Sequence, residues 1–167
     1  MEIERKYLVK YLPEDLESYP HSEISQSYIS TRPVIRIRRN DDRFILTVKS
    51  SGLISREEYE LLLTEEEYTN LSKKAEGNII EKTRYKIPEK DGLTIELDIF
   101  HGIFDRLIYA EVEFPDMEAA EKYNPPAFFG REVTNDGLYQ NSSLSRMSAS
   151  DIEKLLSSVH SLVSDVI

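Results

Sequence analysis

The first six residues of the chain place three charges at alternate positions: Glu2, Glu4 and Lys6. A β-strand projects alternate side chains to one face, so these three charges would point the same way. Such a face is costly in a core and unnecessary in solvent. The pattern gains meaning because it recurs in one predicted strand after another along the chain.

Later segments of the sequence repeat this face, and the charges along it are grouped by sign. Two carboxylates at positions i and i+2 repel each other unless a positive group lies between them, and a divalent cation prefers such oxygen ligands. Paired guanidinium and ammonium groups instead suit a polyanion, because their N–H groups match phosphate oxygens. The face therefore predicts a site for a metal ion and a phosphate chain. Its eight acids are Glu2, Glu4, Glu58, Glu60, Glu96, Asp98, Glu111 and Glu113, and its eight bases are Lys6, Arg36, Arg38, Lys49, Arg56, Lys82, Arg84 and Lys86.

Alternating apolar and polar residues, interrupted by turn signals, predict eight strands and three helices. A capping box that starts at Thr64 predicts a helix that ends near Gly77, and residues 116–123 predict a second helix. Apolar residues at helical spacing predict a third helix over about 149–166. The strands are expected at residues 1–9, 24–31, 34–39, 43–50, 54–63, 79–87, 93–100 and 107–114.

One geometry gathers all the charged faces. It is an α+β fold in which eight antiparallel strands close into a barrel, with a charged lumen and an apolar exterior. Helices would cover the exterior, or a second subunit would, which makes a homodimer one option. An open sheet with one solvated face shows the same alternation and is the simplest alternative. The barrel is preferred because nearly every position on the charged face is Glu, Asp, Lys or Arg.

Composition narrows the class of partner. The 167 residues fit one domain, and the net charge of −10 repels nucleic acid and anionic membranes at long range. No cysteine is present, so metal ligands would be carboxylate or imidazole. No apolar run approaches the length of a membrane span and no signal peptide is visible, so a soluble, cytoplasmic protein is expected.

With these residues assembled, the chain resembles the CYTH superfamily, also called triphosphate tunnel metalloenzymes. A single short motif would be weak, whereas an ordered series along almost the whole chain is specific. The series consists of Glu2-x-Glu4-x-Lys6, the basic strand Val34–Arg38, the strand Phe44–Lys49, Arg56-x-Glu58-x-Glu60, Lys82-x-Arg84, Glu96-Leu97-Asp98 with Phe100-His101-Gly102, Glu111-x-Glu113, Gly130–Thr134 and Tyr139–Asn141.

The resemblance implies a single tunnel domain over residues 1–167 that uses Mg²⁺ or Mn²⁺ and takes a triphosphate. Inorganic triphosphate is the substrate expected of the short bacterial members. Thiamine triphosphatase and adenylate cyclase are alternatives within the fold, and a non-catalytic polyphosphate- or nucleotide-binding module is the alternative that is not an enzyme. Against that module, no acid or base of the motifs is missing. The C-terminal helix either plugs one tunnel mouth or packs on the barrel exterior.

The resemblance also implies roles for the charged residues. Glu2 and Glu4, with Glu111 or Glu113, are expected to hold the first metal. Glu96 and Asp98 are expected to hold a second metal or to orient the attacking water. Phosphates are expected to contact Lys6, Arg36, Arg38, Lys49, Arg56, Lys82 and Arg84, with Glu58 and Glu60 in support. Lys6 is alternatively a base for water, and Tyr28 either places a phosphate or water or is simply a packed tyrosine.

Overall fold

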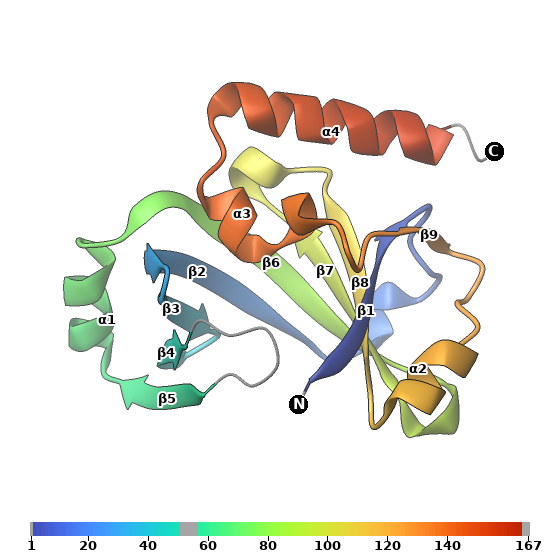
Figure 1. Ribbon diagram of the computed structural model, residues 1–167, viewed down its shortest axis with the longest axis horizontal. Helices are drawn as coiled ribbons and strands as arrows, with labels where there is room; N and C mark the ends of the chain where they lie inside the picture. Colours follow the sequence, from blue (N-terminus) through green and yellow to red (C-terminus); the bar gives the residue numbers. More distant parts are fainter. Residues whose placement is uncertain (1, 51–56, 165–167) are drawn as a thin grey trace.

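The computed structural model describes residues 2–50 and 57–164, with side chains described as far as residue 159. The described part contains nine strands and four α-helices, together with four 3-10 helices of three residues each (Figure 1). The strands are β1 (Ile3–Val9), β2 (His21–Thr31), β3 (Val34–Asn40), β4 (Arg43–Lys49), β5 (Glu58–Leu63), β6 (Glu76–Pro88), β7 (Thr94–Phe100), β8 (Ile108–Phe114) and β9 (Phe129–Glu132). The helices are α1 (Glu65–Ser72), α2 (Met117–Lys122), α3 (Asn141–Ser145) and α4 (Ala149–Ser164).

The strands form one antiparallel sheet in the order β5-β4-β3-β2-β6-β7-β8-β1-β9, and this sheet is open. The expected closed eight-stranded barrel is therefore wrong. Closure would require β5 to pair with β1, but the second neighbour of β1 is β9, through the pairs Tyr7↔Glu132 and Val9↔Phe129. Strand β9 was not predicted, because its four residues are too few to show alternation.

The predicted elements otherwise lie close to the observed ones. The capping box of α1 is present: Thr64 Oγ1 accepts from the Glu67 amide at 3.1 Å, and Glu67 Oε1 accepts from the Thr64 amide at 2.9 Å. The helix ends at Ser72, earlier than expected, because β6 already begins at Glu76. The predicted strand over 54–63 is seen from Glu58 onward, and its first residues lie outside the described part.

The concave face of the sheet has a charged half and an apolar half, because each of four charges has an apolar side chain two residues away on the same face. Leu8 and Phe100 lie two residues after Lys6 and Asp98, and Ile80 and Tyr109 lie two residues before Lys82 and Glu111. These apolar residues are at most 1% exposed. They form one hydrophobic cluster with Leu144 of α3 and with Ile152, Leu155 and Val159 of α4.

Helix α4 lies across one end of the sheet, above β6, β7 and β8 (Figure 1). Its apolar side packs on the apolar half of the concave face. Helix α3, which precedes α4 in the chain, packs closely against β6 at Gly77 (φ 78°). Glycine is required there, because a Cβ would collide with the carbonyl oxygen of Ser145. The C-terminal helices therefore cover the apolar half and leave the charged half to the site.

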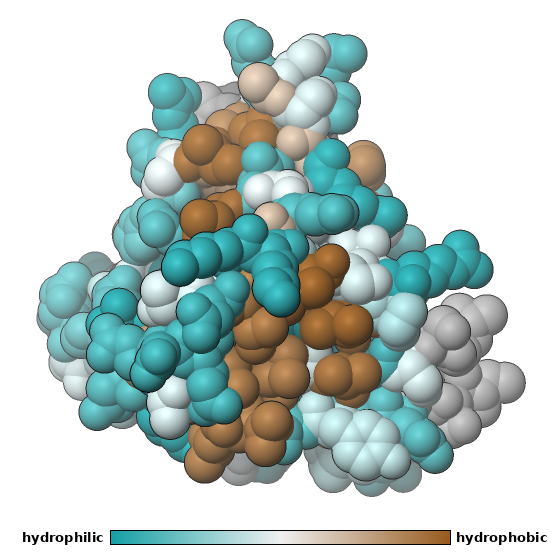
Figure 2. Space-filling view, turned by 90° about the vertical axis from the view of Figure 1, so that its left-hand side faces the viewer, coloured by the Kyte–Doolittle hydropathy of each residue, from teal (hydrophilic) through white to brown (hydrophobic). Residues whose placement is uncertain are grey.

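The convex face carries a second hydrophobic cluster beneath α2 and β9, which includes Leu97, Val112 and Phe129. On the other half of this face, α1 packs against β2–β5, and Ile37 is fully buried. Tyr59 and Leu61 of the edge strand β5 stay 67% and 59% exposed. Figure 2 shows apolar side chains gathered on this side of the molecule. Helices therefore cover the exterior only in part, and the homodimer stays a prediction.

No helix in the described ranges combines the length and the apolar character that crossing a bilayer would need.

Candidate active site

Charged side chains from seven strands line one cavity of about 370 Å³ on the concave face. Although the sheet is open, it curves enough for β1 and β5 to line the same cavity. The lining residues that the sequence had predicted are Glu2, Glu4, Lys6, Tyr28, Arg36, Arg38, Lys49, Glu58, Glu60, Arg84, Glu96, Glu111 and Glu113. The lining residues it had not predicted are Val34, Gln140, Asn141 and Ser142.

The charges in this cavity follow the order of the strands. Central strands β4, β3 and β6 supply Lys49, Arg36, Arg38 and Arg84, whereas the flanking strands supply carboxylates. On one flank stand Glu58 and Glu60 of β5. On the other flank stand Glu96 of β7, Glu111 and Glu113 of β8, Glu4 of β1 and Glu2 just before β1, with Lys6 of β1 among them. A basic band between two acidic bands can hold an anion and, at its edge, a cation.

Lys82 and Asp98 share the face of the site but lie beneath its surface. Their side chains are 0% and 1% exposed, and Lys82 Nζ lies 2.8 Å from Asp98 Oδ2. Arg84 donates from Nε and Nη2 to the two Asp98 oxygens at 2.8 and 2.9 Å, and its Nη1 lies 2.8 Å from Glu96. Burial opposes the charge of Asp98, yet Lys82 and Arg84 lower the pKa of this carboxyl to about 2. Burial lowers the pKa of Lys82 to about 8.

Arg36 and Arg38 are held by neutral groups. Arg38 Nε donates to Gln26 Oε1 at 2.8 Å, and Arg36 Nη2 donates weakly to Thr47 Oγ1 at 3.4 Å. Arg36 Nε is buried without a hydrogen-bond partner among the described residues. Burial, together with the neighbouring Arg36 and Arg84, lowers the pKa of Arg38 to about 10. The two guanidinium groups thus keep a positive charge that no carboxylate of the described chain offsets by an ion pair.

The acidic flank crowds Glu4 against other carboxylates. Register places Glu4 opposite Glu113 and Lys6 opposite Glu111. Burial raises the pKa of Glu4 to about 7, and the adjacent Glu111 and Glu2 add to the rise. A proton or a cation would relieve this repulsion. Within residues 2–50 and 57–164, no three carboxylate or imidazole groups are close enough to share an ion by themselves.

Lys6 links the cavity to the C-terminal segment. Its Nζ lies 3.2 Å from Glu111 Oε1 and donates to the carbonyl of Tyr139 at 3.1 Å. The ammonium also lies 5.1 Å from the centroid of the Tyr109 ring. Tyr28 is 4% exposed in the same cavity, and burial raises the pKa of its phenol despite the nearby Arg36. Tyr28 therefore remains a neutral phenol that can donate or accept a hydrogen bond.

Two remaining sequence predictions have different outcomes. Arg56 lies outside the described residues, so its place is not part of the structure. Lys86 of β6 is exposed and does not line the cavity. The residues that the sequence reasoning missed are neutral: Gln26 below Arg38, and Gln140, Asn141 and Ser142 at the start of α3. The motif-like segment Tyr139–Asn141 was the available signal for the last group.

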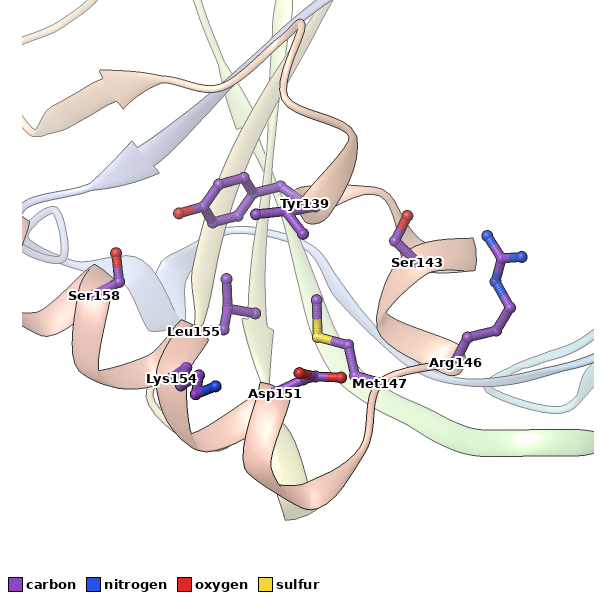
Figure 3. Close-up of a pocket in the computed structure, with 9 residues that line it drawn as sticks. Tyr139, Ser143, Arg146, Met147, Asp151, Lys154, Leu155 and Ser158 are labelled. Carbon is purple, nitrogen blue, oxygen red and sulfur yellow. The ribbon is translucent and has the colours of Figure 1, made fainter.

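A second cavity, of about 490 Å³, lies between α4 and the segment that leads into α3 (Figure 3). Its walls include the apolar side chains of Tyr139, Met147 and Leu155. Figure 3 shows Asp151 and Lys154 at the side of α4, with Arg146 directed away from the apolar wall. The cavity lacks the acidic and basic bands of the first one, so the chemistry of phosphate binding belongs to the first.

The family model for the CYTH domain matches residues 1–146 of this chain. The chain belongs to the CYTH domain family. A curated relative, the inorganic triphosphatase of Nitrosomonas europaea, is 39% identical over 147 residues, which cover 86% of this chain and 95% of the relative. The inorganic triphosphatase of Acetivibrio thermocellus is 41% identical over 112 residues, which cover 66% of this chain and 70% of the relative.

A solved CYTH structure supports the same assignment. The crystal structure of the inorganic triphosphatase NE1496 superposes with a TM-score of 0.73 at 34% identity, covering 89% of this chain and 96% of that one. A putative adenylyl cyclase from Hippeastrum, described as having a dominant triphosphatase activity, superposes at 0.51 with 17% identity, over 72% of this chain and 83% of that one. The second likeness shows the fold alone.

Proposed function

We propose that this protein hydrolyses inorganic triphosphate with the help of a divalent metal ion. One observation carries the proposal: a single cavity joins a basic band, in which two guanidinium groups have no acidic partner, to a flank of crowded carboxylates. Phosphoryl transfer needs this combination, because catalysis rests mainly on positioning the phosphates and stabilising their charge. The names of the two curated relatives support the choice of substrate.

Arg36 and Arg38 are proposed as the main phosphate ligands. Their guanidinium groups are anchored by neutral acceptors, so their charge is available to a polyanion. Lys6 uses two acceptors in the structure, and the third N–H of its ammonium can bind a phosphate oxygen. Lys49, 3.9 Å from Glu58, extends the basic band toward β5. Arg56 is proposed for the same role on sequence grounds alone.

The carboxylates of β1 and β8 fit a Mg²⁺ or Mn²⁺ ion. Mg²⁺ typically binds one or two protein carboxylates and completes its coordination with water and substrate phosphates. Glu4 and Glu111 repel each other, so a cation bound between them would be stabilised most strongly. Glu2 and Glu113 line the cavity beside them. A bound ion there would neutralise charge on the phosphate oxygens. Mg²⁺ and Mn²⁺ both accept hard oxygen ligands, so either ion fits these carboxylates.

Glu96 and Asp98 are proposed for different tasks, although the motif joins them. Glu96 lines the cavity and is in place to orient water or to hold a second metal. Asp98 is 1% exposed, and both of its oxygens are used by Lys82 and Arg84. We therefore assign Asp98 and Lys82 to a buried support that fixes Arg84, and Tyr28 to hydrogen bonding within the cavity.

The structure offers little for a nucleoside. The aromatic side chains of Tyr85, Phe104 and Tyr109 are at most 8% exposed within the hydrophobic clusters, so none of them is free to stack on a base. Among the described residues that line the cavity, Tyr28 is the one aromatic side chain. This arrangement favours a bare phosphate chain over ATP or thiamine triphosphate.

The test is phosphate release from inorganic triphosphate, ATP and thiamine triphosphate, each with Mg²⁺, with Mn²⁺ and with EDTA. We expect turnover to be fastest with inorganic triphosphate and to be lost in EDTA. Chromatography of the ATP sample for cyclic AMP tests the cyclase alternative. Tight binding of triphosphate without any phosphate release would contradict the proposal and favour a binding module.

A further inference from the structure

Gln26 of β2 is fully buried at the base of the charged cavity. Its side chain is 0% exposed, and it lies opposite Arg38 of β3 in the sheet register. Gln26 Oε1 accepts the hydrogen bond from Arg38 Nε at 2.8 Å. The Nε2 atom of the same amide is buried without a hydrogen-bond partner in the described chain. A buried amide whose N–H groups have no acceptor destabilises the folded protein, so the presence of Gln26 at this position needs an explanation.

The contrast with Arg84 supplies that explanation. Arg84 lies in the same cavity and is held by two carboxylates, Asp98 and Glu96. Asp98 also pairs with Lys82, so two carboxylates balance two cations and leave no net positive charge at Arg84. Arg38 is held at the same nitrogen, Nε, and at the same distance of 2.8 Å, but by a neutral amide. The Gln26 amide thus accepts the same hydrogen bond from Nε as a carboxylate would, but it carries no negative charge. Glutamine is also the side chain closest in shape to glutamate, so this difference is almost purely electrostatic.

We propose that Gln26 is a positioning residue for the substrate: it fixes the guanidinium group of Arg38 in direction and leaves its positive charge free for a phosphate. The inference rests on the proposed function, because it assigns the free charge to the triphosphate. Arg38 Nε is occupied by Gln26, and the two terminal nitrogens remain for phosphate oxygens, in the paired geometry that guanidinium groups prefer.

A carboxylate at this position would keep the contact and reverse the electrostatics. A negative charge in place of the Gln26 amide would stand roughly 7 Å from a phosphate bound on the far side of Arg38, a separation made up of two hydrogen bonds and the width of the guanidinium group. At an effective dielectric constant of about 20, repulsion at that separation corresponds to a loss of affinity of roughly 10- to 50-fold. The same carboxylate would offset one of the crowded cations Arg36, Arg38 and Arg84, which favours the folded protein without ligand.

The experiment compares Gln26→Glu and Gln26→Met with the wild type. Binding of inorganic triphosphate is measured by calorimetry in EDTA, thermal unfolding without ligand, and kcat and KM with metal. We expect Gln26→Glu to unfold no earlier than the wild type and to bind triphosphate roughly 10- to 50-fold more weakly. Gln26→Met leaves Arg38 Nε without a partner, so we expect earlier unfolding but a smaller loss of affinity than in Gln26→Glu.

A purely structural role for Gln26 predicts that affinity follows stability. If the more stable of the two variants also binds triphosphate better, or if Gln26→Glu binds like the wild type, the inference is overturned. A double-mutant cycle with Arg38→Ala decides the matter without Gln26→Glu, should that variant not fold. We expect Gln26→Met to have no further effect on affinity once Arg38 is removed, and additive effects would overturn the inference.

The same measurements separate this inference from the proposed function. A wild-type protein that binds triphosphate but does not hydrolyse it would contradict the enzymatic function, and the affinities of the variants would still judge the role of Gln26. A wild-type protein that hydrolyses triphosphate, with a Gln26→Glu variant of unchanged affinity, would contradict the role of Gln26 alone. A wild-type protein that does not bind triphosphate would overturn both.

Discussion

Replacing Asp98 by Asn is the sharpest test of the support beneath the cavity. The change keeps the size of the side chain and removes the charge that offsets Lys82, which is 0% exposed and 2.8 Å away. Arg84 loses its paired contact with Asp98 but keeps Glu96 at 2.8 Å. The main consequence is therefore a buried ammonium without a carboxylate.

The cost can be worked out in two ways. Removing one partner of a buried ion pair typically costs about 3 to 5 kcal/mol. The lowering of the Asp98 pKa from 3.8 to about 2 corresponds to roughly 2.5 kcal/mol of stability. Both figures point to about 3 kcal/mol, which for a chain of this size lowers Tm by roughly 6 to 12 °C.

The difference from the wild type depends on pH. Burial already lowers the pKa of Lys82 to about 8, below its usual 10.5, so the unfolded chain binds more protons between these values and stability rises with pH there. Without Asp98 the pKa of Lys82 falls further, so the stability of the variant starts to rise with pH at a lower pH than that of the wild type. In acid, the wild type loses the contribution of Asp98 as pH falls from 3.8 toward 2. The gap in Tm should therefore be largest near pH 5 and narrow on both sides.

Thermal unfolding of both proteins at a series of pH values from 3 to 9 is the assay. The double variant Asp98→Asn with Lys82→Met serves as the control, because removing both charges should recover much of the lost stability. Equal Tm values for the wild type and Asp98→Asn at pH 5 would refute the reasoning. A gap that stays constant up to pH 8 would refute the part assigned to Lys82.

The remaining predictions concern the cavity and its cover. Glu4→Gln should leave the fold intact and lower metal-dependent kcat by about 100-fold or more, since one carboxylate of the crowded flank is lost; a rate like that of the wild type would exclude Glu4 as a metal ligand. Arg38→Ala should raise KM and lower kcat together. The control is Arg39→Ala, which should change neither, because Arg39 lies on the opposite face of the same strand and donates to the Asp41 carbonyl. Equal effects of the two substitutions would contradict the proposed site. Leu155→Ala, which truncates a side chain that is 6% exposed in the cluster under α4, should cost about 2 to 4 kcal/mol in urea unfolding with KM unchanged, and a raised KM would show that α4 acts on the site.

The concave face could be predicted from the sequence because strand alternation fixes which side a residue takes. This rule placed Glu2, Arg38 and Glu111, which are far apart in the chain, in one cavity. Alternation does not give depth, and so it could not distinguish Arg84, which lines the cavity, from Lys82, which lies beneath it. Depth depends on where the C-terminal helices cover the sheet, which is a property of tertiary packing.

Whether the sheet closes could not be predicted from the sequence, for a related reason. Strand alternation says nothing of whether the two edge strands meet, and that outcome depends on curvature and on the short strand β9, which takes the edge of β1. The neutral residues Gln26 and Asn141 were not predicted as site residues, because a pattern of charges carries no information about uncharged side chains. The available signal for Gln26 was its position two residues before Tyr28, which places both side chains on the same face of their strand.

The CYTH model ends at residue 146, whereas the hydrophobic cluster on the concave face draws Ile152, Leu155 and Val159 from beyond that point. A chain shortened to residue 146 would retain all the described side chains that line the charged cavity, yet it would present Phe104, Leu107 and Leu144 to water. The residues that line the charged cavity thus end at Ser142, whereas the residues that complete the hydrophobic cluster extend to Val159. Grafting the motif region into another scaffold would therefore also require helix α4, although none of its described side chains lines the charged cavity.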